Sequence, residues 1–399
     1  MSRSDDDLVE GRARRSRAFV TVAVMVLVLA ILPVAARRLG GDGAPRPEAA
    51  VDGTAPTDGI VTPPPAPGLH GRLVFTTFET RGSLERQQQL WVLDLETGAL
   101  TEGPLVPVAE ELSVADEERG WLVLVGTGPD AQGIAYLLTA LTTTAEPLEL
   151  GRGDLLSLSG DGEHLLVGRT EPTGRTGPGC RDHRFELHSV SVESGAGSIL
   201  ADGTLSCGNL VSGTLVDGVP LVSVVVDGRP EIWLVRPGDY EVLFTDLAYF
   251  SSSPRGTFLL VDPEGEVLRG LGVWPRTPTG RLLVWPGAGA PRPLLDAPRL
   301  FAQRTLAWSP SGSHVVVNGI VGDRRGMWLV YVPGGRVESL LPPNSFPLRS
   351  GFSGAAFDDR GTVFAGAPGA LVARTEAGIV PLPLPPDAPS PAGPVAWLP

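Results

Sequence analysis

Residues 305–341 read TLAWSPSGSHVVVNGIVGDRRGMWLVYVPGGRVESLL, and this stretch decides the fold. Short runs of β-branched and aromatic residues alternate in it with Pro-Ser-Gly and Pro-Gly-Gly turns. The turn glycines supply the positive φ at which a hairpin reverses direction. The stretch therefore predicts four antiparallel strands, at Leu306–Ser309, His314–Asn318, Met327–Val332 and Val337–Leu341.

Weaker copies of this four-strand unit lie on both sides of it in the chain. Each copy carries a glycine in its first hairpin, at Gly120, Gly162, Gly218, Gly256, Gly312 and Gly361. Tandem four-strand units that recur every 40 to 50 residues or so are typical of β-propeller blades. The repeat therefore predicts an all-β protein with six complete propeller blades.

Residues 71–105 form a seventh, incomplete unit. They hold patterns for a second, third and fourth strand, but only a Pro-rich segment precedes them. The missing first strand is predicted at the other end of the chain, where PVAWLP at 394–399 resembles TLAWSP at 305–310. We expect Val395–Leu398 to complete blade 1 and close a seven-bladed ring, which removes the exposed edges of an open array. The alternative is a frayed C-terminal tail.

The overall composition agrees with this fold and excludes several functions. Gly and Pro account for 51 and 39 of the 399 residues, about twice their average share, which disfavours long helices. A formal net charge of −13 disfavours nucleic-acid binding, because phosphates would be repelled. The sequence contains no Gly-x-Ser-x-Gly elbow, phosphate loop, dinucleotide fingerprint or Asp-rich calcium loop. We therefore expect no catalytic residues, no metal and no cofactor.

The N-terminal region predicts a membrane anchor. Residues 18–36 carry no charge and would form a helix about 28 Å long, close to the thickness of a hydrocarbon core. Four Arg lie at positions 12–17 just before this segment and two follow it, which places the N-terminus inside and the bulk of the chain outside the cell. The competing interpretation is a cleaved signal peptide, with Val34 and Ala36 at the cleavage positions. Both interpretations predict export.

Four regions follow from these patterns. Residues 1–17 form a cytoplasmic tail, 18–36 a transmembrane helix, 37–69 a Pro/Gly-rich linker and 70–399 the propeller domain. The linker cannot bury enough apolar surface to fold by itself, so it acts as a semi-extended spacer.

The chain has two cysteines, and their positions predict a disulfide. Cys180 falls between the second and third strands of its unit, and Cys207 in the connection to the next unit. In an antiparallel blade these two connections emerge on one face, and an oxidising compartment permits a Cys180–Cys207 bond. A metal site with the nearby His183 and His188 is the alternative, but the spacing matches no common zinc signature. Two free thiols are the third possibility.

Several long loops carry basic residues that could form a binding face. All of them join second to third strands, so they should rise on one face and could meet an anionic partner. The candidate residues are Arg81, Arg86, Arg175, Arg181, His183, Arg324 and Arg325. The alternative is ordinary solvated loop charge. The remaining histidines, including His70, show no pairing in sequence that suggests a relay.

One motif resembles a known family. WSPSG at 308–312, followed by an apolar strand and MWLVYV, is similar to the WD-like (WD40-like) repeat of TolB-type β-propellers, whose pattern is Trp-Ser-Pro-Asp-Gly. The chain departs from this pattern in Ser-Gly-Asp-Gly at 159–162 and Ser-Pro-Arg-Gly at 253–256. The resemblance implies a propeller fold and, by analogy alone, protein interaction in the bacterial envelope.

Anchor, spacer and propeller together predict a non-catalytic, extracytoplasmic binding or scaffolding module. Its partner would be an envelope protein or ligand that the sequence does not identify. The alternative is a propeller lyase or hydrolase that uses carboxylates in the central channel. Such an enzyme requires two or more carboxylates close together there.

Overall fold

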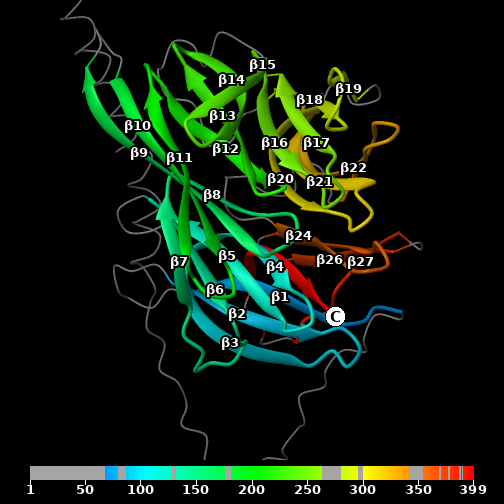
Figure 1. Cartoon of the computed structure of the whole chain (residues 1–399). Helices are drawn as coiled ribbons and strands as arrows, with labels where there is room; N and C mark the ends of the chain where they lie inside the picture. The colour runs from blue at the N-terminus through cyan, green and yellow to red at the C-terminus, as the bar shows by residue number, and fades with distance from the viewer. Residues whose placement is uncertain are drawn as a thin grey trace, which may run out of the picture. The chain divides into compact units, whose positions relative to one another are not determined.

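The computed structural model is shown in Figure 1. It describes residues 68–79, 87–127, 132–175, 181–262, 280–294, 300–340, 354–367, 370–375, 378–385, 388 and 390–399. The regular secondary structure of these residues is β-strand throughout, so the predicted all-β class is confirmed.

The described strands form seven four-stranded antiparallel blades, and the strands of each blade lie side by side in order from the first to the fourth. Blade 1 consists of β28 (Pro391–Leu398), β1 (Arg72–Glu79), β2 (Gln87–Asp94) and β3 (Leu100–Pro107). Blade 2 consists of β4 (Ala109–Asp116), β5 (Trp121–Thr127), β6 (Gly133–Leu138) and β7 (Leu148–Gly153). Blade 3 consists of β8 (Leu155–Leu158), β9 (His164–Arg175), β10 (Arg181–Ser191) and β11 (Gly197–Leu205).

The other four blades continue in chain order. Blade 4 consists of β12 (Asn209–Val216), β13 (Val219–Val226), β14 (Arg229–Arg236) and β15 (Asp239–Thr245). Blade 5 consists of β16 (Ala248–Ser252), β17 (Phe258–Asp262), β18 (Gly280–Trp285) and β19 (Arg292–Pro293). Blade 6 consists of β20 (Leu300–Trp308), β21 (His314–Val321), β22 (Arg324–Tyr331) and β23 (Arg336–Ser339). Blade 7 consists of β24 (Gly354–Phe357), β25 (Val363–Ala367), β26 (Ala370–Thr375) and β27 (Gly378–Pro381). A short pairing of β18 with β20 also joins blades 5 and 6.

The C-terminal strand completes blade 1, as predicted. β28 pairs antiparallel with β1, with Leu398 opposite Arg72 and Val395 opposite Phe75. Figure 1 shows this red strand beside the blue β1. β28 also contacts β4 of blade 2 and β24 of blade 7, so it joins the two ends of the repeat. The ring of blades is therefore closed by the C-terminus.

The apolar core lies between blades rather than at one centre. Each of the seven interfaces between the described blades has its own cluster of buried apolar side chains. In β1, Leu73 and Phe75 pack toward blade 7, whereas Val74 packs toward blade 2, and all three are fully buried. This alternation follows from the two-residue period of a strand.

The glycines of the first hairpins adopt the predicted backbone conformation. Their φ angles are all positive, from 68° at Gly120 to 84° at Gly361. Residues with a Cβ rarely adopt this conformation, which explains why the repeat places glycine there.

The predicted tail at 1–17, the transmembrane segment at 18–36 and residues 37–67 of the linker lie outside the described residues. Within the described part of the chain, no helix has the length and apolarity needed to cross a membrane. The last linker residue, Leu69, is buried in the cluster between blades 7 and 1.

Candidate functional site

In several blades a buried polar residue organises the turn between the first and second strands. In blade 6, Ser309 Oγ accepts the backbone N–H of His314 at 3.0 Å. Ser159 of blade 3 and Ser253 of blade 5 accept backbone N–H groups in the same way. Satisfying a buried N–H avoids a desolvation cost of roughly 1 to 3 kcal/mol.

Blade 7 has an aspartate at this position. Asp358 Oδ1 accepts the N–H groups of Arg360 at 3.0 Å and Thr362 at 2.6 Å, and the residue is 1% exposed. One carboxylate oxygen therefore takes the place of the serine hydroxyl in the other blades. The second oxygen, Oδ2, is left to face a different group.

That group is His70, which lies immediately before β1. The closing strand fixes its position, because the Trp397 indole N–H donates to the His70 carbonyl at 3.0 Å. The Trp397 ring also meets the imidazole edge-on, with ring centroids 5.5 Å apart. The C-terminal strand thus places His70 beside the first hairpin of blade 7.

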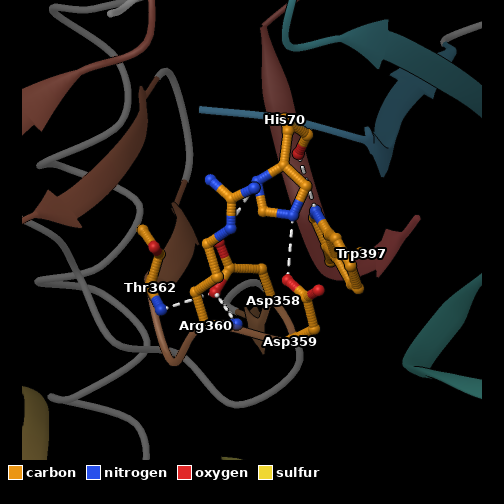
Figure 2. Close-up of polar contacts among 6 residues, drawn as sticks. All are labelled: His70, Asp358, Asp359, Arg360, Thr362 and Trp397. Atoms are coloured by element: carbon orange, nitrogen blue, oxygen red, sulfur yellow. Dashed lines mark hydrogen bonds and ion pairs between the residues drawn. The ribbon is translucent and has the colours of Figure 1, made fainter. Parts of the chain in front are cut away.

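Figure 2 shows the imidazole of His70 between two carboxylates. Its Nε2 lies 2.8 Å from Asp359 Oδ1, and its Nδ1 lies 3.9 Å from Asp358 Oδ2. Within the described residues, Nδ1 is buried and has no hydrogen-bond partner. Asp359 is 63% exposed, whereas the side chain of His70 is 19% exposed. The junction between blades 7 and 1, which we call the seam, therefore carries a mostly buried imidazole between a buried and an exposed carboxylate. We call His70, Asp358 and Asp359 the seam cluster.

Sequence reasoning did not select this cluster, because its histidine and Asp359 stand 289 residues apart. The one available signal was the aspartate in DDRG at 358–361, where the equivalent hairpins of blades 3, 5 and 6 begin with serine. Without the pairing of β28 with β1, nothing in the sequence joins that aspartate to His70.

Among the predicted basic residues, those that the structure describes lie in two different blades. Arg81 and Arg86 lie outside the described residues. Arg175 and Arg181 are opposite each other at the end of the β9–β10 hairpin of blade 3, and His183 follows on β10. Arg324 and Arg325 are exposed at the start of β22 in blade 6, three blades further on.

The turn that carries Cys207 contacts the start of β10 in blade 3. The backbone N–H of Cys207 donates to Oδ1 of Asp182 at 3.0 Å, and Asp182 follows Cys180 by two residues in the chain. Cys180 itself lies outside the described residues, so the Cys180–Cys207 disulfide remains a prediction.

The channel-enzyme alternative depends on acidic residues of the first strands. In the described first strands these are Glu110, Glu111 and Asp116, all on β4. Glu110 and Glu111 are consecutive at an irregularity of β4, where its pairing with β5 shifts register. Asp116 accepts the backbone N–H of Arg119 at 2.9 Å in the following turn.

Burial raises the pKa of Tyr249, on the first strand of blade 5, to about 12, so its phenol is protonated at neutral pH.

Comparison with known proteins supports the fold. No protein-family model and no curated protein matches the chain. An acylaminoacyl peptidase solved with a chloromethyl ketone matches with a TM-score of 0.54 at 12% identity, over 79% of this chain and 51% of the peptidase. This chain thus spans about half the length of that peptidase.

Two shorter proteins match as well. The β-propeller domain of the Trilobed protease from Pyrococcus furiosus, described as having an open velcro topology, matches with a TM-score of 0.50 at 11% identity over 80% of this chain and 97% of its own. TolB from Acinetobacter baumannii matches with a TM-score of 0.43 at 13% identity, over 82% and 83% of the two chains. At these identities the likenesses to the acylaminoacyl peptidase and to the Trilobed protease domain show the fold alone, a β-propeller.

Proposed function

We propose that this protein is a non-catalytic binding or scaffolding propeller that is exported and tethered to the membrane. Residues 18–36 form the anchor with residues 1–17 in the cytoplasm, and the linker to residue 69 holds the propeller away from the bilayer. The charge asymmetry around the apolar segment supports this orientation. A closed ring supports the binding role, because propellers present their loops on rigid frameworks.

One observation carries the proposal, the length of the β9–β10 hairpin in blade 3. β9 has 12 residues, but β8 pairs only with its segment Leu165–Gly168. Asp154 then accepts the backbone N–H of Thr170 at 2.8 Å. From Glu171 to Arg175, β9 is paired with β10 and lies beyond the end of β8. The hairpin therefore extends beyond the end of β8, and its last pairs, Gly174 with Asp182 and Arg175 with Arg181, also lie beyond the end of β11. We call this end of the hairpin the arm (Figure 1).

The chemistry of this arm suits a polar, anionic partner. Arg184 lies 3.2 Å from Glu186 and 3.5 Å from Asp202, which are exposed ion pairs that stiffen the base of the arm only slightly. At its tip Arg175 and Arg181 occupy opposite positions of the two strands. Two arginines at paired positions of the strands favour a carboxylate or phosphate group on the partner.

The proposal is tested with the full chain, purified in mild detergent and used to capture partners from envelope extracts. A captured partner is then titrated against the wild type, against Arg175→Ser/Arg181→Ser, and against Arg324→Ser/Arg325→Ser as a charge-matched control in blade 6. We expect the blade 3 variant to bind at least about tenfold more weakly and the control to bind normally.

Two outcomes would contradict the proposal. The first is equal loss of affinity in both variants, which would remove blade 3 as the binding arm. The second is the absence of any specific partner together with turnover in a hydrolase and lyase screen, which would favour the channel enzyme. Export is tested separately, since protease added to intact spheroplasts should digest a propeller that lies outside and spare one that lies inside.

A further inference from the structure

We propose that the seam cluster binds a divalent transition-metal ion, best matched by Zn²⁺, which ties the start of the propeller to blade 7. This inference concerns a different part of the molecule from the partner-binding arm and stands without it. The sequence predicts no metal there, because residues so far apart form no recognisable spacing.

The donor atoms lie close enough together for one ion. One ring nitrogen of His70 and one oxygen each of Asp358 and Asp359 lie within 4.8 Å of one another. Zinc bonds of about 2.1 Å require donors roughly 3.0 to 3.4 Å apart, so donors at the 4.8 Å limit have to move together by about 1.4 Å. The exposed carboxylate of Asp359 can supply that movement, whereas Asp358 is held by two backbone N–H groups.

The type of donor also fits. A neutral imidazole and two carboxylates carry a formal charge of −2, which matches a divalent cation. Imidazole favours zinc and similar ions, whereas Mg²⁺ and Ca²⁺ prefer oxygen donors alone. Open coordination positions would hold water, as in other sites with three protein ligands.

A second, independent observation is the buried Nδ1 of His70. It has no hydrogen-bond partner in the described part of the molecule, and the nearest carboxylate oxygen, Asp358 Oδ2, is too far for a hydrogen bond at 3.9 Å. A buried ring nitrogen left in this way costs free energy. The two ring nitrogens point away from each other, so one ion takes only one of them. An ion on Nδ1 satisfies that nitrogen and the free oxygen of Asp358, and Asp359 joins it by leaving its contact with Nε2.

The surroundings hold two of the donors in place before any ion arrives. The indole of Trp397 fixes the backbone at His70, and the turn amides fix Asp358. Such outer contacts orient ligands and raise metal affinity. Arg360 lowers the affinity for a cation. Its side chain lies beside the imidazole in Figure 2, and its positive charge repels a metal ion there. Arg360 is exposed and can swing away.

The chain offers a control cluster at Asp161, Glu163 and His164, whose donors also lie within 4.8 Å of one another. There, Asp161 Oδ1 already accepts the Ser159 hydroxyl and the backbone N–H of Glu163. All three residues belong to one short turn, so this cluster joins no distant segments. We expect no tight site at this place.

The test is calorimetric titration of Zn²⁺ into the full chain, freed of metal with chelator and carrying no polyhistidine tag. We expect one site, weakened at least about tenfold in His70→Gln and in Asp359→Asn. Asp161→Asn should bind like the wild type. Arg360→Gln should bind about two to five times more tightly, because a repulsive charge is removed.

Thermal unfolding supplies the second readout. Zn²⁺ should raise the unfolding midpoint of the wild type and Asp161→Asn, and leave that of His70→Gln unchanged. The proposal is overturned if the wild type binds no Zn²⁺ at about 100-fold excess over protein. It is also overturned if His70→Gln and Asp359→Asn retain wild-type affinity, which would place the ion elsewhere, for example on the cysteines.

Discussion

At the scale of single residues, Gly71 controls how closely the two ends of the chain approach. Its φ is +79°, and a Cβ there would lie 2.5 Å from the Leu398 carbonyl oxygen and 2.8 Å from the Trp397 indole nitrogen. The contact at 2.5 Å is with a backbone atom of the closing strand, and a backbone atom cannot move away as easily as the end of a flexible side chain. Both the conformation and the space thus require glycine at the seam.

We expect Gly71→Ala to lower the free energy of unfolding by about 3 kcal/mol, from the positive φ and the displaced strand together. Gly218→Ala is the matched control, because Gly218 has a φ of +76° and open space around its Cβ position. It should cost only about 1 kcal/mol. Denaturant titration of both variants measures the difference, and equal losses would mean that the strand does not press on Gly71.

A second residue-scale prediction concerns His314. Partial burial, and then the positive charge of Arg374, lower its pKa below the ordinary value of 6.5. The folded protein therefore binds this proton less tightly than the unfolded chain does. The contribution is fully favourable above about pH 6.5 and declines as the pH falls below it.

The measurement is the unfolding midpoint at about pH 7.5 and about pH 5.5, on either side of the ordinary histidine pKa. The fall between these values should be smaller in His314→Gln than in the wild type, because the variant has no proton to take up. An unchanged pH dependence in His314→Gln would show that burial of this ring does not bias its titration.

At the scale of elements, the first hairpins were the most predictable feature. Each depends on residues close in sequence, a turn glycine and an acceptor such as Ser309, and these leave a repeated pattern. The strands of residues 305–341 accordingly begin or end within a few residues of their predicted limits, apart from an earlier start of β20. The seam cluster left no such pattern, since pairing across the ring determines it.

The length of the β9–β10 hairpin was also missed. Its strand pattern is interrupted by Pro172 and Gly174, which indicate a loop when read locally. In the structure β9 continues to Arg175, and the register shifts between Asp182 and His183 to accommodate the irregularity. A bulge lets a hairpin pass over residues that would otherwise break it.

The predicted disulfide belongs to this element. The contact of the Cys207 amide with Asp182 brings its turn to the start of β10. We expect non-reducing peptide mapping of the full chain to recover Cys180 linked to Cys207. On the loop-entropy model such a bond contributes about 3 to 4 kcal/mol, so reduction should lower the unfolding midpoint. Two alkylatable thiols in oxidised protein would refute the bond.

At the scale of the whole molecule, stability depends on completing the ring. Each blade buries one face against its neighbour on either side, so an incomplete blade exposes two clusters at once. The sequence could predict the number of blades and the closing strand because both follow from the repeat. It could not predict what lies at the seam, because the ends of a repeat are where its pattern stops.

Removing residues 393–399 tests this dependence. The deletion takes away Val395 and Trp397 from the cluster with blade 7, and Ala396 and Leu398 from the cluster with blade 2. All four are at most 4% exposed, so their loss should cost roughly 5 kcal/mol or more in unfolding free energy. We expect the unfolding midpoint to fall by at least about 5 °C.

The control is removal of Pro399 alone, which is exposed and should leave the midpoint unchanged. The deletion also removes Trp397, which anchors His70. Zn²⁺ should therefore no longer raise the midpoint of the deleted protein, although all three donors of the seam cluster remain. An unchanged melt would show that β28 contributes nothing to closure. A retained zinc effect would show that the seam cluster forms without the closing strand. The two results therefore separate the contribution of β28 to the stability of the ring from its role in positioning the seam cluster.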